Sequence, residues 1–578
     1  MAQRPIVHQD GRPGNLNYHP MRASFLAVAL LAATSAPSPA SPRPARRAET
    51  VRFTVTVAPS AHTGPLTGRL VLAIAKAAQP EPRLLISPRG PALFAIDLEA
   101  LQPGAPAILD DKALGFPRSL AELPPGDYFA QAVINVYEQV HRSDGKSIWV
   151  HMNDGRVEFF SNAAGNLYSD VIPIRVGNGN TISVNVNHVI PKPEPLTDTE
   201  WLKHVTIQSP TLTKFWGRPI FVQAHVLLPK GYAEHPSTRY PSVYTLGHGT
   251  TPLSFSTTPP RTGAPTAVSP VTGLESGYAT YQAWSSDNYP RVVAITLEQQ
   301  TPYFPDSYSV NSANNGPYGD AIVQEIIPDL ERRFRIIAKP YARQLEGAST
   351  SGWQTLAMQL QHPDFFGGAW VFQPDPIDFT RYQMTNIYTD SNAFSVPSGP
   401  FTSIERGFQR TPDGQTLITT RELSRFEAVL GSRGRSGYQL EAWEAVYGPV
   451  GEDGYPLPLW DKLSGKIDHN VATYMRDHGY DLRAFVEQNW ATIGPKVVGK
   501  LHFSAGDMDD YWLNLAVYKF EDFLKSTKDP HYDGDFIYGR PMKGHAWHPD
   551  TWANFIRKVA ASIKASAPAG ESSAAWNY

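Results

Sequence analysis

The sequence predicts an α/β fold with a mostly parallel sheet, preceded by an all-β, sandwich-like module. Two patterns support this prediction. Over residues 50–190, short runs alternate apolar and polar residues with a period of two, and no long helical period appears. Beyond residue 198, strand-like runs alternate with helical ones, as in parallel sheets that carry helices on both faces. A chain of 578 residues is also too long for one ordinary domain.

Composition narrows the functional classes. The chain has 51 basic and 54 acidic residues, a net charge of −3, and neither sign forms long blocks. We therefore expect no nucleic-acid partner and no polybasic membrane surface. There is no cysteine, which excludes disulfides, thiolate catalysis and zinc sites built on cysteine. We expect no metal and no cofactor, because the pair His545 and His548 lacks a third ligand at helical spacing.

Residues 1–48 are expected to hold a signal peptide followed by a Pro-rich linker. Met21 and Arg22 precede a short apolar run, Ala23–Ala33, and small residues suited to cleavage follow it. The run is too short to span a bilayer, so no membrane span is expected. The signal would start at Met21, because residues 1–20 are polar. The alternative is a disordered tail. Export without cysteine is typical of a secreted or periplasmic bacterial protein.

The module over 50–190 is predicted from its strand patterns. "VRFTVTV" places Val51, Phe53, Val55 and Val57 on one face, and "TISVNVNHV" alternates in the same way. After the boundary "IPKPEPLTDTE", the α/β domain is expected over 198–568. It begins with an antiparallel strand pair, "HVTIQS" and "RPIFVQAHVLLP".

Within the α/β domain, "DAIVQEIIPDLERRF" has apolar residues at four-residue spacing, which predicts a helix. The alternation of strands and helices fails over about 375–495. This stretch is rich in aromatic residues and partly helical. We expect it to be an insertion that covers the carboxyl edge of the sheet like a lid.

The stretch "LEGASTSGW" lies between a predicted strand and a predicted helix. It resembles the G-x-S-x-G turn that exposes a nucleophilic serine, with Gly347 before Ser349 and Ser351 in place of the second glycine. Small residues are needed there because the strand and the helix approach closely. We therefore predict Ser349 as a nucleophile. Ser351 is a weaker candidate, because it lacks the small residue two positions earlier.

A serine nucleophile needs an acid and then a histidine later in the chain. "LHFSAGDMDDYW" ends a strand and places acidic residues in the following loop; among them we favour Asp509 as the acid. Asp507, and Asp375 or Asp378 after the preceding strand, remain alternatives. The loop could also serve only to cap the next helix, through Asp510.

His545 is the predicted general base. It follows the probable strand "DFIYG" and precedes the terminal helix, whereas His548 lies near the helix start and is expected to be structural. The oxyanion hole would use the N–H of Thr350 and a second N–H from the Gly249/Thr250 region. His248, in that same turn, is expected to shape the loop.

Two aromatic residues are candidates for substrate binding, Trp353 and Tyr318. Aromatic residues more often pack in a core or beneath a lid, so this expectation competes with a purely structural role.

These motifs together resemble the putative-esterase family, the esterase D and enterochelin-esterase branch of the α/β hydrolases. The resemblance spans about 204–565 and rests on "LLPKGY", "YPSVYTLGHG", "NNGPYGDAIVQEIIPDLERRFR", "EGASTSGWQTLAMQLQHPDFFGGAW", "AGDMDD" and "GHAW". It implies Ser349 as nucleophile, Asp509 as acid and His545 as base. The sequence departs from the family pattern in Ser351, in Gly247 before the His-Gly pair, and in the long insertion.

The expected function is a secreted serine esterase that hydrolyses a small-molecule or saccharide ester through an acyl-enzyme. Acyl transfer to an alcohol, as in mycolyltransferases of this fold, would use the same triad. A non-catalytic binding protein on a hydrolase scaffold is the third possibility. The sequence carries no signal for the oligomeric state.

Overall fold

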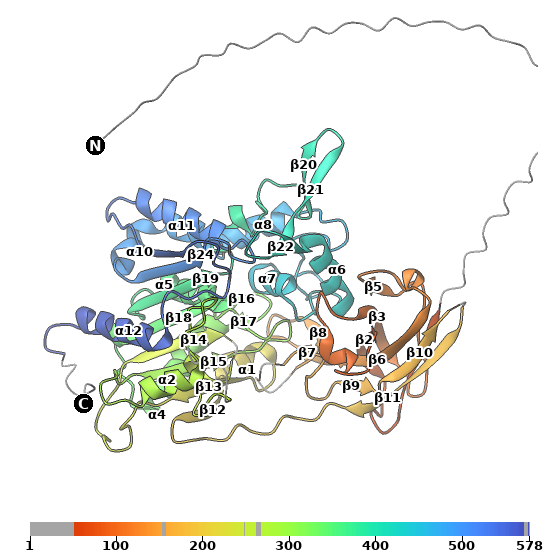
Figure 1. Ribbon diagram of the computed structural model, residues 1–578, viewed down its shortest axis with the longest axis horizontal. Helices are drawn as coiled ribbons and strands as arrows, with labels where there is room; N and C mark the ends of the chain where they lie inside the picture. Colours follow the sequence, from red (N-terminus) through yellow and green to blue (C-terminus); the bar gives the residue numbers. More distant parts are fainter. Residues whose placement is uncertain are drawn as a thin grey trace, which may run out of the picture. The chain divides into compact units, whose positions relative to one another are not determined.

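The fold is described from a computed structural model that covers residues 51–152, 156, 158–177, 179–247, 249–261, 268–571, 576 and 578 (Figure 1). The predicted signal peptide and linker lie outside the described residues, as does His248. The chain from Glu49 to Tyr578 forms one compact unit.

An eight-stranded sheet organises the part of the chain after residue 200. Its strands follow the order β12-β13-β15-β14-β18-β19-β24-β25. The pairs β12–β13 and β13–β15 are antiparallel and all later pairs are parallel, so the predicted antiparallel entry and mostly parallel sheet are confirmed. In spatial order the strands are Leu202–Gln208, Phe221–Leu227, Val293–Glu298, Ser242–Gly247, Arg343–Ser349, Gly368–Pro374, Leu501–Gly506 and Asp535–Gly539.

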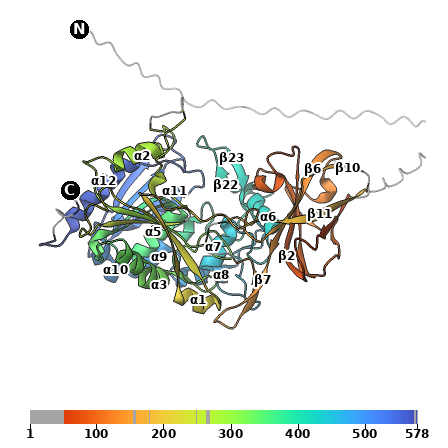
Figure 2. The same ribbon diagram turned by 90° about the horizontal axis from the view of Figure 1, so that it is seen from below.

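Helices cover both faces of this sheet, as the side chains of β19 show. Ala369 and Val371 point into a core with α5, whereas Trp370 and Phe372 pack their rings against Phe555 of α12. Figure 2 shows α2 and α12 on one side of the strands, with α9 and α10 on the other. The helices are α1 Pro210–Trp216, α2 Gly277–Trp284, α3 Tyr318–Ala321, α4 Ile327–Arg333, α5 Thr350–Gln361, α11 Asn514–Ser526 and α12 Trp552–Ser566.

The helix predicted at "DAIVQEIIPDLERRF" is present but not uniform. A π-helical turn, Ile322–Ile326, joins α3 to α4. Ile322, Ile326 and Leu330 are fully buried, as their spacing predicted. The short strands β16 Asn311–Ser312 and β17 Gly316–Pro317 form a small hairpin just before α3.

The N-terminal module is all-β, as predicted. Nine strands join in one sheet, and inward side chains from β1, β2, β6 and β11 meet in a single apolar core. The strands are β1 Arg52–Val57, β2 Leu66–Ala75, β3 Ala92–Leu101, β4 Ala107–Leu109, β5 Leu114–Phe116, β6 Gly126–Val136, β9 Leu167–Ser169, β10 Ile172–Val176 and β11 Thr181–Val189. A separate hairpin joins β7 Glu138–His141 to β8 Ser147–Val150.

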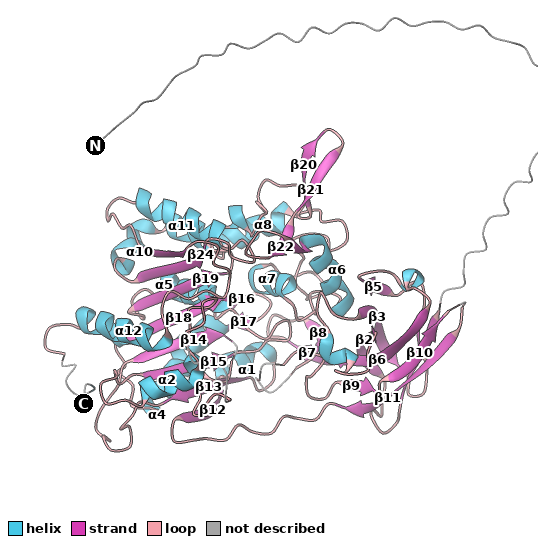
Figure 3. Ribbon diagram, in the orientation of Figure 1, coloured by secondary structure: helices cyan, strands magenta, loops and turns pink. Residues whose placement is uncertain are grey.

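The stretch between β19 and β24 contains five helices and two hairpins in its described residues (Figure 3). Its longest helix, α6, begins with a capping box in which Thr419 and Glu422 bond each other's backbone N–H groups. The elements are β20 Ser395–Gly399, β21 Thr402–Glu405, β22 Gly407–Arg410, β23 Thr416–Thr419, α6 Thr420–Leu430, α7 Gln439–Tyr447, α8 His469–Asp477, α9 Leu482–Gln488 and α10 Trp490–Val497.

The module is bound tightly to α6 of this insertion. Arg69 of β2 is buried and donates hydrogen bonds to the last carbonyls of α6, those of Ala428 and Val429, at 2.9–3.1 Å. A third guanidinium nitrogen lies 3.1 Å from a carboxylate oxygen of Asp97. The positive charge at the carboxyl end of a helix also complements its dipole. The module is therefore packed onto the insertion and is not a loosely tethered domain.

Among the residues that the structure describes, no helix combines the length and apolarity needed to cross a membrane.

Replacing Arg69 with Met should destabilise the protein by about 2–4 kcal/mol, because it leaves the end carbonyls of α6 without donors in a buried contact. The control is Arg52→Met, at the exposed first residue of β1. Thermal unfolding of both variants measures the difference. Equal melting temperatures for the two would contradict the proposed anchoring.

Candidate active site

Ser349 occupies a strained turn between strand and helix. It is the last residue of β18, and α5 begins at Thr350. Its backbone has φ 59° and ψ −123°, a conformation that residues with a side chain rarely adopt. Such strain is typical of a residue whose side chain must be presented at a site. The turn places the Ser349 side chain at the wall of a cavity at the carboxyl edge of the sheet.

Two glycines, Gly247 and Gly347, make room for this turn. The side chain of Ser351 explains why both positions hold glycine. A Cβ on Gly347 would lie 2.5 Å from the Cβ of Ser351, and a Cβ on Gly247 would overlap the Ser351 hydroxyl. Ser351 therefore fills the space that side chains at positions 247 and 347 would otherwise occupy. Two departures from the family pattern, Ser351 and Gly247, are therefore linked, because the side chain of Ser351 packs where a side chain at position 247 would lie.

Asp509 and His545 meet at the same edge of the sheet. The first follows β24 and the second follows β25, and a carboxylate oxygen of Asp509 lies 2.7 Å from Nδ1 of His545. Asp509 is fully buried, and its other oxygen accepts the N–H groups of Tyr511 and Leu513 at 2.8 and 3.1 Å. These bonds orient the carboxylate toward the imidazole.

The environment favours a protonated His545. Burial lowers its pKa, but the charge and hydrogen bond of Asp509, with further contributions from Asp375 and Asp510, outweigh burial and raise the pKa above its ordinary value. An imidazole in this setting readily accepts and holds a proton, which is what a general base in acyl transfer must do.

Two of the alternative acids, Asp507 and Asp378, have structural partners. An oxygen of Asp507 accepts the N–H of Lys543, and an oxygen of Asp510 accepts the N–H of His545. Asp510 therefore supports the histidine loop. The alternative, that it caps the next helix, is not observed, because no side chain caps the start of α11. Asp378 accepts the N–H of Thr380 and pairs with Arg483 at 2.7 Å.

Asp375 is the third alternative acid, and it lies beside Ser349. One of its oxygens is 3.3 Å from the Ser349 hydroxyl. The other accepts bonds from Tyr308 at 2.6 Å and from the indole N–H of Trp443 at 3.2 Å. Gln439 and the Thr350 hydroxyl also donate to it, both at 3.2 Å.

Burial raises the pKa of Asp375, although the bonds from Tyr308 and Trp443 oppose this change. No hydrogen bond joins Asp375 to His545 in the structure; the partner of that imidazole is Asp509. Asp375 thus contacts Ser349, while Asp509 contacts His545.

Ser349 and His545 line one cavity of about 720 Å³. The hydrogen bond of the Ser349 hydroxyl goes to Asp375, and no bond from Ser349 to His545 occurs in the structure. Gly249 and Thr350 also line the cavity, whereas Thr250 is exposed and does not. Of the predicted oxyanion residues, the structure brings Thr350 and Gly249 to Ser349 and leaves Thr250 outside.

The structure corrects the expectation for Trp353 and Tyr318, because neither lines this cavity. Trp353 is fully buried on the core face of α5, where its ring packs against Tyr308 and Tyr447. Tyr318 is buried as well, and its hydroxyl donates to the Gln300 carbonyl at 3.1 Å. Both are core residues.

His548 is also structural, as expected. It is buried between rings of Phe372 and Trp552, and Nδ1 contacts the Asp550 carbonyl. Burial lowers its pKa.

Several lining residues could not be found from the sequence. Ser87, Pro88, Arg89 and Phe159 come from the N-terminal module, and Gln439 and Trp443 come from α7 of the insertion. Their sequence neighbourhoods carry no motif, and only the packing of three distant parts of the chain brings them to Ser349.

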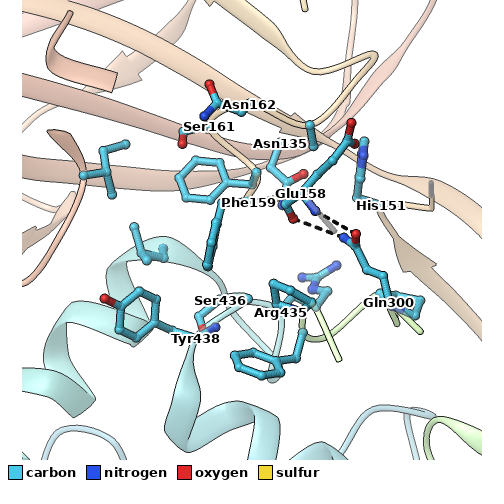
Figure 4. A pocket seen from close by; sticks show the side chains of 18 of the residues that line it. Asn135, His151, Glu158, Phe159, Ser161, Asn162, Gln300, Arg435, Ser436 and Tyr438 are labelled. Carbon is cyan, nitrogen blue, oxygen red and sulfur yellow. Dashed lines mark hydrogen bonds between the residues drawn. The ribbon is translucent and has the colours of Figure 1, made fainter. Parts of the chain in front are cut away.

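A second cavity of about 310 Å³ lies beside the first (Figure 4). Phe159, Phe304 and Tyr438 line both cavities. In its wall, the Gln300 amide exchanges hydrogen bonds with the backbone N–H and carbonyl of Glu158 at 2.8 and 3.1 Å, which ties the module to the α/β domain. The module therefore contributes to both cavities.

Among the described residues, no group of three or more His, Asp or Glu side chains has a geometry that could hold a metal ion.

The packing of Ser351 against Gly247 can be tested with a double-mutant cycle on the two positions. Gly247→Ala should cost about 1–3 kcal/mol, because the added methyl overlaps the Ser351 hydroxyl. In a Ser351→Gly background the same change should cost much less. Thermal unfolding of the four variants gives the coupling energy. An equal cost of Gly247→Ala in both backgrounds would show that the two residues do not compete for space.

Part of the chain matches a known family of proteins. Residues 217–405 match a family model described as putative esterase, a segment that includes Ser349 but not Asp509 or His545. A search of curated proteins finds no significant match.

Solved structures that are similar include a ferulic acid esterase, with 15% identity, 63% of this chain and 99% of that chain covered, and a TM-score of 0.29. An S-formylglutathione hydrolase from Staphylococcus aureus has 15% identity, coverage of 63% and 98%, and a TM-score of 0.30. The corresponding enzyme from Agrobacterium tumefaciens has 12% identity, coverage of 64% and 95%, and a TM-score of 0.28. The predicted resemblance to the putative esterase family is therefore confirmed by the family model over residues 217–405, and it supports an ester hydrolase as the class of this enzyme.

Proposed function

We propose that this protein is a secreted serine esterase that hydrolyses a carboxylic ester through an acyl-enzyme, with Ser349, His545 and Asp509 as its triad. One observation supports this most strongly. A buried, 2.7 Å Asp509–His545 pair opens onto the same cavity as a serine held in a strained strand-to-helix turn. A core residue has no need of either feature, whereas a nucleophile and its base need both.

Acylation would begin when the Ser349 hydroxyl turns from Asp375 toward His545. Its oxygen attacks the ester carbonyl carbon, and its proton passes to Nε2 of His545, whose Nδ1 is held by Asp509. The carbonyl oxygen becomes an oxyanion, which the N–H groups of Thr350 and of the Gly249 turn would stabilise. The proton on His545 then goes to the departing alcohol as the C–O bond breaks.

Deacylation would reverse these roles with water. His545 takes a proton from water, the resulting hydroxide oxygen attacks the acyl carbon, and Ser349 leaves with the proton from His545. The acid product then departs. The cavity of about 720 Å³ can hold a small-molecule or saccharide ester.

Secretion is part of the proposal and rests on the sequence alone. The short apolar run after Met21 and the small residues that follow it support export, and so does the absence of cysteine.

The roles of the two carboxylates near the site, Asp509 and Asp375, should be distinguishable by substituting each in turn. Asp509→Asn should lower kcat for a p-nitrophenyl ester by about 10³–10⁴-fold, because the imidazole loses the partner that sets its tautomer. Asp375→Asn should cost far less, because this carboxylate contacts the serine and not the base. Ser349→Ala gives the baseline, in activity and in labelling by a fluorophosphonate. Loss of activity in Asp375→Asn with normal activity in Asp509→Asn would transfer the acid role to Asp375.

The pH dependence of kcat/KM should reflect His545. The base must be neutral to accept a proton, so kcat/KM falls as the pH drops through the pKa of His545. Because Asp509 raises this pKa, the midpoint should lie above the ordinary histidine value of about 6.5. In Asp509→Asn the residual activity should show a midpoint at lower pH. Profiles over pH 5–9 of both proteins check this, and a midpoint that stays in place would contradict it.

A further inference from the structure

A carboxylic acid outside the triad lies in the wall of the catalytic cavity. Glu346 is on β18, three residues before Ser349, and lines the same cavity. It ends a row of polar side chains in register across five strands of the sheet, formed by His204, His225, Thr296, Thr245 and Glu346. Parallel sheets covered on both faces are normally apolar at such positions, so this row needs an explanation.

Glu346 has no charged partner among the described residues. It is only 3% exposed, and its one side-chain hydrogen bond there comes from the Thr245 hydroxyl. Burial without a compensating cation raises its pKa to about 7, and no described basic group contributes to that value. By contrast, the buried Glu298 of β15 has His225 at 3.2 Å.

The surroundings of Glu346 in the cavity suit a positive charge. Thr245 and Thr296 contribute hydroxyl groups, and Trp552 contributes an indole ring whose N–H has no partner in the described structure. A carboxylate together with an aromatic ring is the combination that recognises ammonium groups. A buried carboxylate without a partner is costly, and a ligand cation would remove that cost.

The other charged groups of the cavity do not oppose a cation at Glu346. Asp375 is the other carboxylic acid among the described lining residues, and a carboxylate at that position would attract a cation as well. Two basic side chains line the cavity. Arg89 is exposed, so solvent screens its charge, and His545 is paired with Asp509 at 2.7 Å.

We propose that Glu346, Thr245, Thr296 and Trp552 form an ammonium-binding subsite, so that the preferred ester carries a positively charged nitrogen on its acyl or its alcohol part. This proposal rests on the function proposed above and adds the substrate class to it.

The test compares esters that differ only in charge. On the alcohol side, butyrylcholine is paired with 3,3-dimethylbutyl butyrate, in which carbon replaces the charged nitrogen. On the acyl side, the p-nitrophenyl ester of 4-(trimethylammonio)butyrate is paired with that of 5,5-dimethylhexanoate. We expect kcat/KM of the cationic ester to exceed that of its neutral partner by about tenfold or more at pH 8 in one of the pairs. The pair that responds tells which part of the ester carries the charge.

Ionisation of Glu346 gives a second readout in the unaltered chain. The ratio of cationic to neutral kcat/KM should rise between pH 6 and pH 8, because Glu346 becomes negative as the pH passes through about 7. The pH dependence that the triad gives to kcat/KM is the same for both esters of a pair, so it cancels in the ratio. A ratio near one at every pH in both pairs would overturn the subsite while leaving the esterase function intact.

Glu346→Gln should bring the ratio close to one, whatever it does to the neutral ester. Glu405→Gln, on the exposed hairpin strand β21, is the matched control and should keep the ratio of the unaltered chain. His248→Gln is included because this residue lies outside the described structure next to β14. A ratio lost in His248→Gln and kept in Glu346→Gln would contradict the assignment to Glu346.

Protection of Ser349 keeps the subsite testable if none of these esters is turned over. Choline should slow fluorophosphonate labelling at lower concentration than 3,3-dimethylbutan-1-ol does, and Glu346→Gln should remove the difference. Equal protection by both alcohols would overturn the proposal. Absence of any labelling would instead mean that the proposed esterase function has failed.

Discussion

The turn at Ser349 is the constraint on which the rest of the site depends. A strand must pass into a helix within one residue, and the backbone can do so only where the neighbouring segments of the chain leave space for the turn. Gly247 and Gly347 leave that space, and Ser351 fills it. With the serine held at the carboxyl edge of a parallel sheet, the loops after β24 and β25 lie at that edge too. His545 therefore lines the same cavity as Ser349, with the buried Asp509 behind it.

The other two parts of the chain are built into this site. Helix α7 of the insertion supplies Gln439 and Trp443 to Asp375, the carboxylate that contacts the Ser349 hydroxyl. The module in turn binds α6 through Arg69 and contributes loop residues to the cavity wall. Because each part contacts the next, the shape of the substrate cavity depends on all three, and the choice of ester is a property of the assembled chain.

Local sequence patterns predicted the fold class. They also predicted Ser349, Asp509, His545 and Thr350 as site residues, because each lies at the end or the start of a strand or helix whose period is visible in the sequence. The same reasoning failed for Trp353. Its place in the apolar stripe of α5 indicates burial, and the structure puts it in the core. Tyr308, Gln439 and Trp443 could not be predicted as partners of Asp375, since they lie more than 60 positions from it in the sequence. The module residues of the cavity could not be predicted either, because they too come from a distant part of the chain. Glu346 was equally hidden, because a buried charge in a strand has no periodic signature.

The central claim is that Ser349 carries the acyl group during turnover. Rapid acid quenching of the protein during hydrolysis of a p-nitrophenyl ester, followed by proteolysis and mass spectrometry, tests it most directly. The account predicts an added acyl mass on the peptide that contains Ser349, which forms and decays at rates consistent with turnover. Acylation of a different residue, or turnover by rapid release of product without any acylated peptide, would contradict it.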